Sequence, residues 1–297
     1  MGVDTLERYS SYPCVFDSLE IADTIGTDLQ FGTNVIDEVA GGSLDVLKSA
    51  VANAAPTVSI ECLNLAHLAT ISPTVGLHIS AAACYIQYQR RANGGAFSGS
   101  GDLLLKAMQG FLCPVSIQAS QNSNQAARLS LKFVPEYDGT NPCIDIVSDS
   151  LESSPAIAAM FRLAKVTVAG TAVAGNQSTK VDFGIDYQTT HADGDIFPRV
   201  GGIYARKPSI TIESKNLQGF LALTGTTRAQ LGGNVVAYFK KEGVANGTGE
   251  HISVTLTTPN AMLTNIAANP NDDPRPAVMF TPTAGTTIAV ATNATIS

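Results

Sequence analysis

The stretch Pro56-Thr-Val-Ser-Ile-Glu-Cys-Leu-Asn-Leu65 occurs a second time in the chain, as Pro208-Ser-Ile-Thr-Ile-Glu-Ser-Lys-Asn-Leu217. After the proline, apolar and polar residues alternate, so that Val58 and Ile60 share one face of an extended chain. This period is typical of a β-strand with one buried face. The two copies therefore predict equivalent strands, at residues 57–62 and 209–214.

A short helix is predicted directly after each of these strands. Asn64 and Asn216 suit its start, because an asparagine side chain can accept a hydrogen bond from the first turn of a helix. Apolar residues then follow at helical spacing. They are Leu65, Leu68 and Ile71 in the first copy and Leu217, Phe220 and Leu221 in the second.

The similarity between the two copies extends well beyond this stretch. A shift of 152 positions aligns residues 31–71 with residues 183–223 without a gap. Self-similarity at this scale indicates that one supersecondary unit was duplicated. The identical pairs are Phe31/Phe183, Gly32/Gly184, Ala40/Ala192, Gly42/Gly194, Pro56/Pro208, Ile60/Ile212, Glu61/Glu213, Asn64/Asn216 and Leu65/Leu217.

Two later landmarks recur in the same order in both copies. Strand-like residues lead to Asn93-Gly94 and again to Asn246-Gly247, a dipeptide that tolerates the backbone angles of a tight turn. Further on, the stretch that begins Phe133-Val-Pro-Glu matches the one that begins Phe280-Thr-Pro-Thr. Each half of the chain therefore carries the same series of elements.

The predicted architecture is mainly β with a minor helical part, in the form of two tandem β-sandwich or barrel domains that each carry a short flanking helix. We expect an N-terminal arm at residues 1–14, a first domain at 15–152 and a second domain at 153–297. The second domain is expected to end in a C-terminal arm that begins at Thr286. Residues 149–160 are the predicted joint.

Two features within the predicted domains are less regular. Each domain has a long connection between its first strands, at residues 38–55 and 190–207. The first domain also has a predicted helical insertion at residues 98–113, because Asp102-Leu-Leu-Leu-Lys-Ala-Met-Gln109 has an amphipathic pattern after a Gly/Ser-rich loop.

Composition and charge favour a protein that assembles with partners. Apolar residues make up 44% of the chain and charged residues only 14%, which is low for a soluble domain, so much of the surface is expected to be covered. The net charge of −7 is uneven, because residues 1–152 hold 16 acidic and 7 basic residues and residues 153–297 hold 9 and 11. An acidic chain with two isolated basic pairs, Arg90-Arg91 and Lys240-Lys241, attracts nucleic acid poorly.

The five cysteines predict buried, reduced thiols rather than disulfides or a zinc site. They include no Cys-x-x-Cys pair, their number is odd, and all lie in the first half of the chain. This pattern favours synthesis in a reducing cytosol. We also expect no secretory signal, and no apolar run is long enough for a membrane-spanning helix. The cysteines are Cys14, Cys62, Cys84, Cys113 and Cys143.

The best metal candidate in the sequence is the group His191, Asp193 and Asp195. The matching positions of the first copy, Val39-Ala-Gly-Gly-Ser43, hold no metal ligand, so a polar turn is the favoured interpretation. There is no phosphate-binding loop and no His-Glu-x-x-His motif. We therefore predict no metal and no cofactor.

Catalysis has equally little support in the sequence. Glu61 and Glu213 recur at one position of the repeat, but on an alternating strand a solvated or interface face is favoured over an acid/base pair. His67 and His78 lie near apolar segments, where structural histidines are more common. No Gly-x-Ser-x-Gly motif is present, and we predict no catalytic residues and no enzyme.

The order and duplication of these motifs resemble the tail tube (major tail) proteins of long-tailed bacteriophages, in a form with two fused tube domains. The resemblance rests on the long connection within each domain, the Pro-x-Ile-x-Ile-Glu-type strand with its Asn-Leu helix, and the Phe-x-Pro end of a later strand. It covers most of residues 15–290. It implies tail-tube-like domains that assemble in rings of six, stacked into a hollow tube through which the genome is ejected.

The partners implied by this resemblance are further copies of the chain, a tape-measure protein, and tail terminator and distal tail proteins. DNA would pass through the lumen without specific binding, and no membrane partner is implied. Because one chain supplies two domains, the expected ring is a homotrimer with approximate sixfold symmetry. The protein would be made in the host cytoplasm and end in the virion tail. Residues expected to contact the neighbouring ring are Leu44, Val46, Leu47, Ile196, Phe197, Ile203 and Tyr204.

Three other classes of protein stay open at this stage. A distal-tail, baseplate or other virion component could use the same domain, although no receptor-binding module is evident. An adhesin or binding module of tandem sandwiches would be expected to carry an export signal. A hydrolase on a β-scaffold would need a convergent polar site, and the sequence shows none.

Overall fold

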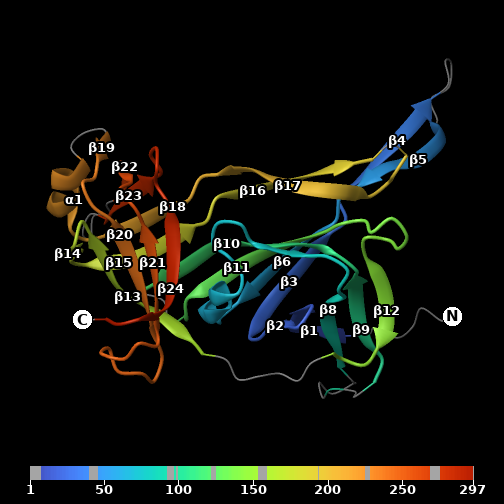
Figure 1. Ribbon diagram of the computed structural model, residues 1–297, viewed down its shortest axis with the longest axis horizontal. Helices are drawn as coiled ribbons and strands as arrows, with labels where there is room; N and C mark the ends of the chain where they lie inside the picture. The colour runs from blue at the N-terminus through green and yellow to red at the C-terminus, as the bar shows by residue number, and fades with distance from the viewer. Residues whose placement is uncertain are drawn as a thin grey trace.

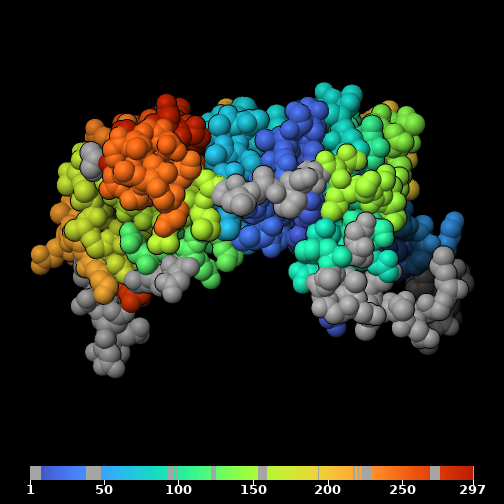
Figure 2. Space-filling model, turned by 90° about the horizontal axis from the view of Figure 1, so that it is seen from below, coloured from blue at the N-terminus to red at the C-terminus, as the bar shows by residue number. Residues whose placement is uncertain are grey.

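The computed structural model describes residues 8–39, 46–91, 97, 100–121, 125–152, 159–192, 194–224, 228–267 and 275–296. We call residues 8–152 the first half and residues 159–296 the second half. The fold is mainly β, as the sequence predicts. Figure 2 shows the two halves as adjoining lobes.

The strands of the first half are β1 (Arg8–Phe16), β2 (Leu19–Ile21), β3 (Thr24–Gln30), β4 (Thr33–Val39), β5 (Val46–Ala54), β6 (Thr57–Cys62), β7 (Leu77–Ile79), β8 (Cys84–Arg91), β9 (Asp102–Ala107), β10 (Gly110–Ser120), β11 (Arg128–Pro135) and β12 (Asp145–Asp149), and a 3₁₀-helix, η1, spans Leu65–Ala69.

The elements of the second half are β13 (Phe161–Val168), β14 (Thr171–Ala172), β15 (Asn176–Asp182), β16 (Ile185–His191), β17 (Pro198–Arg206), β18 (Ser209–Ser214), α1 (Leu217–Thr224), β19 (Arg228–Gln230), β20 (Val235–Lys241), β21 (His251–Leu256), β22 (Asn260–Ala267), β23 (Arg275–Thr281) and β24 (Ile288–Ala294).

The same arrangement of strands occurs twice. The first half has a five-stranded sheet of order β12-β9-β8-β1-β2, and the second half has one of order β14-β13-β20-β21-β24. Read from the opposite side, the second order matches the first strand for strand. The two predicted strands that define the repeat are confirmed as β6 and β18.

One large sheet joins the two halves. Its ten strands include nine in the order β19-β22-β23-β18-β15-β10-β11-β6-β3, with β7 paired to β10 outside this path. Five strands come from each half, and the halves meet where β10 pairs with β15. Figure 1 shows this sheet running through the middle of the molecule. The halves are therefore not separate beads, because the backbone ladder continues from one into the other.

Residues of both halves contribute to one hydrophobic core. The inward side chains of the ten-stranded sheet follow the alternation in the sequence: Val58, Ile60, Ile210 and Ile212 are buried. Phe16 of β1, in the first five-stranded sheet, packs against this face: its ring centroid lies 4.8 Å from that of Phe133 of β11, and both side chains are buried. The opposite face of the sheet carries the polar residues.

The short helices also begin where the sequence predicts. The Asn64 side chain accepts a hydrogen bond from the Ala66 N–H at 3.0 Å, and the Asn216 side chain accepts one from the Gly219 N–H at 3.0 Å. In the first half the helix is a single 3₁₀ turn, whereas α1 spans Leu217–Thr224.

The long connections of the two halves are β-hairpins, formed by β4 with β5 and by β16 with β17. Each begins at a glycine with positive φ, Gly32 at 55° and Gly184 at 60°. A Cβ atom there would lie 2.6 Å from the carbonyl oxygen of Ala55 or 2.1 Å from that of Lys207. Only glycine fits this entry into the hairpin, which explains why the repeat keeps it.

The predicted helical insertion at residues 98–113 is wrong. Asp102–Ala107 forms β9, which pairs with β8 and β12 and occupies the place that β21 takes in the second half. Leucine, lysine, alanine and methionine favour helices in isolation, but neighbouring strands on both sides supply a ladder that outweighs this preference.

The two predicted arms are also wrong. Residues 8–14 of the predicted N-terminal arm lie in β1, which pairs with β8, and residues 1–7 lie outside the described residues. Most of the segment from Thr286 lies in β24, which pairs with β21. Both strands belong to the five-stranded sheets. The predicted first domain therefore omits a strand that it needs. The predicted joint falls between β12 and β13, and residues 153–158 of it lie outside the described residues.

Candidate functional site

The two halves are joined by a contact between two strands, β10 of the first half and β15 of the second half. One edge of β10 pairs with β7 at Gly110–Leu112 and with β15 at Ser116–Ser120. At its centre Ile117 lies opposite Val181, and both side chains are fully buried. A ladder of backbone hydrogen bonds with an apolar inner face thus holds the halves together.

The repeat places a second pair of such edges at the two ends of the ten-stranded sheet. The counterpart of β15 is β3, which among the described residues pairs only with β6. The counterpart of β10 is β22. One edge of β22 pairs with β19 at Asn260–Met262, and beyond Met262 this edge pairs with no described strand. The two ends of the ten-stranded sheet therefore carry the same two complementary edges that meet at the internal junction.

Side chains at these open edges are exposed where their counterparts are buried. Ile266 corresponds to Ile117 and is 45% exposed, and Leu29 corresponds to Val181 and is half-buried. Apolar side chains at an unpaired strand edge are typical of a surface that another strand covers.

The identical pair Phe31 and Phe183 shows the same contrast more clearly. Phe183 is 1% exposed, and its backbone N–H donates to the carbonyl oxygen of Val115 in the first half at 3.0 Å. Phe31 occupies the same place in the repeat, directly after β3, and is 48% exposed. Since residue type and local fold are the same, the difference arises because only Phe183 has a neighbouring half.

The β16–β17 hairpin adds a second contact between the halves. In Figure 1 it runs from the second half across the first, toward β4 and β5. The Ala54 N–H donates to the carbonyl oxygen of Ile196 at 2.9 Å, and the Tyr137 N–H donates to that of Pro198 at 2.8 Å. Among the described side chains of the equivalent β4–β5 hairpin, the apolar residues Val35, Ile36 and Val51 are exposed.

A polar cluster around one buried carboxyl group lies at the base of the β16–β17 hairpin. Glu136, which is 4% exposed, pairs through Oε2 with His78 Nε2 at 3.0 Å. Its Oε1 accepts a hydrogen bond from the Tyr187 hydroxyl. The Tyr187 ring stacks on Phe111, with centroids 3.9 Å apart. Burial, together with the hydrogen bond to Glu136, raises the pKa of Tyr187, so the phenol remains a donor.

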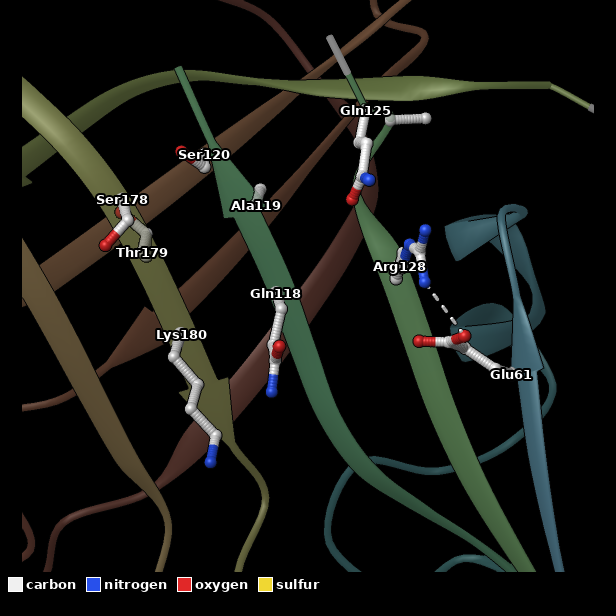
Figure 3. A pocket seen from close by; sticks show the side chains of 10 residues that line it. Glu61, Gln118, Ala119, Ser120, Gln125, Arg128, Ser178, Thr179 and Lys180 are labelled. Atoms are coloured by element: carbon white, nitrogen blue, oxygen red, sulfur yellow. Dashed lines mark hydrogen bonds and ion pairs between the residues drawn. The ribbon is translucent and has the colours of Figure 1, made fainter. Parts of the chain in front are cut away.

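The outward face of the ten-stranded sheet is polar around the junction. A groove of about 380 Å³ lies there, and Figure 3 shows its side chains projecting from β6, β10, β11 and β15. Arg128 Nη1 lies 3.1 Å from Glu61 Oε2, whereas Lys180 stands on the opposite wall. This face mixes both signs of charge with serine, threonine and glutamine.

The residues predicted to contact a neighbouring ring fall into three groups. Leu44 lies outside the described residues, and of Val46 and Leu47 only the backbone in β5 is described. Ile196 and Tyr204 are exposed, and Ile203 is half-buried. Phe197 lies 6.3 Å from Tyr137 of the same chain, measured between ring centroids. Contact with another ring remains a prediction.

The remaining candidates from the sequence stay apart from one another. Asp195 lies 3.8 Å from the Arg199 guanidinium, Asp193 is outside the described residues, and no group of three possible metal ligands gathers in the described part of the chain. His67 is buried beside the carbonyl oxygen of Ala22, and burial lowers its pKa. All five cysteines are free and buried, as predicted.

Sequence reasoning missed Glu136 and Tyr187. Both lie in stretches that the repeat aligns, but their counterparts are Thr283 and Val35, so they stand out only as differences between the copies. No pattern in the sequence places these two residues, 51 positions apart, in contact.

No family model and no curated protein matches this sequence. Among the described helices, none has the length and apolar character needed to cross a membrane.

Proposed function

We propose that the protein is a structural subunit that assembles with copies of itself into closed rings, which stack into the hollow tube of a phage tail. The contrast between Phe183 and Phe31 carries the proposal. The internal junction shows that one edge of this repeat can bury the other. The two ends of the ten-stranded sheet carry a second pair of the same two edges, which no described strand covers. A head-to-tail contact of this kind generates a ring when its rotation closes.

The repeat also supplies the expected register between chains. Ser116 pairs with Asp182 and Ile117 with Val181 inside the chain. The equivalent pairs are Asn265 with Gln30 and Ile266 with Leu29 of the next chain. Three chains would contribute six repeated units, which is the number that the resemblance to tail tube proteins implies. Strand addition supplies backbone hydrogen bonds, and the apolar side chains supply most of the affinity.

The polar face of the ten-stranded sheet suits the inner wall of such a tube. Its basic groups are accompanied by acidic ones, as in the pair of Arg128 and Glu61. A wall with balanced charges would let DNA pass without holding its phosphates. The protein would then serve as a conduit and needs no catalytic residues for this role.

The test is electron microscopy and mass measurement of the purified full-length protein over a range of concentrations. We expect rings of three chains, or tubes with threefold symmetry. Ile266→Lys, which places an ammonium group in the apolar part of the junction, should abolish them. Ile146→Lys on β12 should not, although Ile146 is the more exposed of the two isoleucines. The proposal would be contradicted by a protein that stays monomeric at high concentration, or by rings that form equally well with Ile266→Lys.

A further inference from the structure

The internal junction and the proposed junction between chains share a backbone frame but differ in side chains at the base of the hairpin. Inside the chain, Tyr187 of β16 enters a site formed by Glu136, His78 and Phe111 of the first half. The matching site of the second half contains Thr283, Gln230 and Asn260. This follows from strand register, because Phe111 pairs with His78 as Asn260 pairs with Gln230.

The residue that corresponds to Tyr187 on the other hairpin is Val35. It is 55% exposed and lies beside Ile36, which is 52% exposed. Val51, the counterpart of Ile203 on the returning strand, is 48% exposed. The β4–β5 hairpin thus presents apolar side chains where the β16–β17 hairpin presents a tyrosine, and nothing within the described chain covers them.

Resting on the proposed function, we propose that the β4–β5 hairpin docks across the second half of another copy of this chain, with Val35 beside Thr283 and Asn260, as Tyr187 lies beside Glu136 and Phe111. The occupant is a second copy because the chain already contains the same hairpin seated on the same kind of surface.

The contact inside the chain should be stronger than the contact between chains. The internal contact is held by a buried carboxyl group that receives hydrogen bonds from two elements, and removal of the Tyr187 hydroxyl would leave Glu136 with an unsatisfied oxygen. The contact between chains has no ionisable group at the three matching positions. The halves of one chain therefore stay joined while rings form and dissociate, and assembly proceeds by addition of whole chains.

A double-mutant cycle tests the docking position. Val35→Tyr and Thr283→Glu transfer the hydroxyl and carboxyl groups of the internal cluster to the contact between chains. The measured quantity is the protein concentration of half-assembly for the full-length chain, its two single variants and the double variant. We expect the double variant to assemble at a concentration at least tenfold below that given by multiplying the two single effects, because interacting residues are not additive.

A matched control keeps the same groups but separates them. Val200 is an exposed valine on the β16–β17 hairpin, and Val200→Tyr combined with Thr283→Glu should give multiplied effects only. If the effects of Val35→Tyr and Thr283→Glu on the half-assembly concentration also merely multiply while the parent protein assembles, the hairpin docks elsewhere and the inference is wrong. If the parent protein never assembles, the proposed function fails first, and the two failures are distinguishable.

A second measurement examines the internal cluster without relying on assembly. Tyr187→Phe keeps the ring that stacks on Phe111 and removes only the hydroxyl. Hydrogen exchange at the backbone amides of residues 178–182 in β15 should become several-fold faster, whereas exchange in β21 should not change. Unchanged protection of β15 would show that the cluster does not hold the halves together.

Discussion

Phe31→Ala tests the proposed assembly at one side chain. Phe31 is 48% exposed in the isolated chain, and its counterpart Phe183 is 1% exposed at the internal junction. If chains join as the halves do, Phe31 loses nearly all of its remaining exposure when a ring closes. The substitution should therefore weaken assembly while leaving the fold of the chain intact.

The size of the effect follows from the exposed area. A phenylalanine side chain buries roughly 200 Å², so about half of it, roughly 100 Å², would be covered on assembly, worth about 2.5 kcal/mol. Alanine retains a little of this, which leaves about 2 kcal/mol per junction and about 6 kcal/mol for a ring with three junctions. That free energy lowers the association constant of a trimer by a factor of about 10⁴. For a trimer, the protein concentration of half-assembly varies with the inverse square root of this constant, so half-assembly should require about a hundredfold more protein.

The assay is mass photometry or sedimentation over a dilution series, with thermal unfolding measured in parallel. Phe97→Ala is the matched control, because Phe97 is 55% exposed and pairs with Arg91 of β8, in a sheet that contains neither of the two open edges. If Phe31→Ala assembles at the same concentration as the parent protein, or if Phe97→Ala weakens assembly equally, the equivalence of the two junctions is refuted.

Three further predictions concern the chain itself. Burial raises the pKa of Cys14 and Cys62 to about 12, so a thiol reagent at pH 8 should modify them slowly until the protein is denatured, and rapid labelling of the native protein would contradict this. Phe133→Ala should destabilise the fold by about 3–5 kcal/mol in denaturant unfolding, against less than about 0.5 kcal/mol for Phe97→Ala, because Phe133 is fully buried and Phe97 is exposed; similar losses would contradict this difference in burial. Burial lowers the pKa of His67, so the unfolded chain binds its proton first as pH falls below about 6.5. Stability should therefore decline between pH 7 and 5, and His67→Gln should reduce that decline; an unchanged pH dependence would exclude His67 as its source.

The repeated stretch at residues 57–62 and 209–214 could be predicted because its information is local. The alternation that buries Val58 and Ile60 needs no knowledge of distant residues, and the asparagine that begins each helix acts within one turn. The buried state of the cysteines followed from their types and spacing in the same way. The sequence comparison of the two halves also identified Phe31 and Phe183 as equivalent, although not that their exposure differs.

Only the tertiary structure determined which segments far apart in the sequence come into contact. Asp102–Ala107 has a helical preference and became a strand because β8 and β12 offered backbone partners on both sides, and both predicted arms became strands for the same reason. The joining of the halves through β10 and β15, and the meeting of Glu136 with Tyr187, depend on the register of strands far apart in the chain. The amino-acid sequence by itself determined that one β-rich unit is present twice. The fold determined that the copies share a single sheet, because strand edges are satisfied by whichever strand lies beside them and not by their neighbours in sequence.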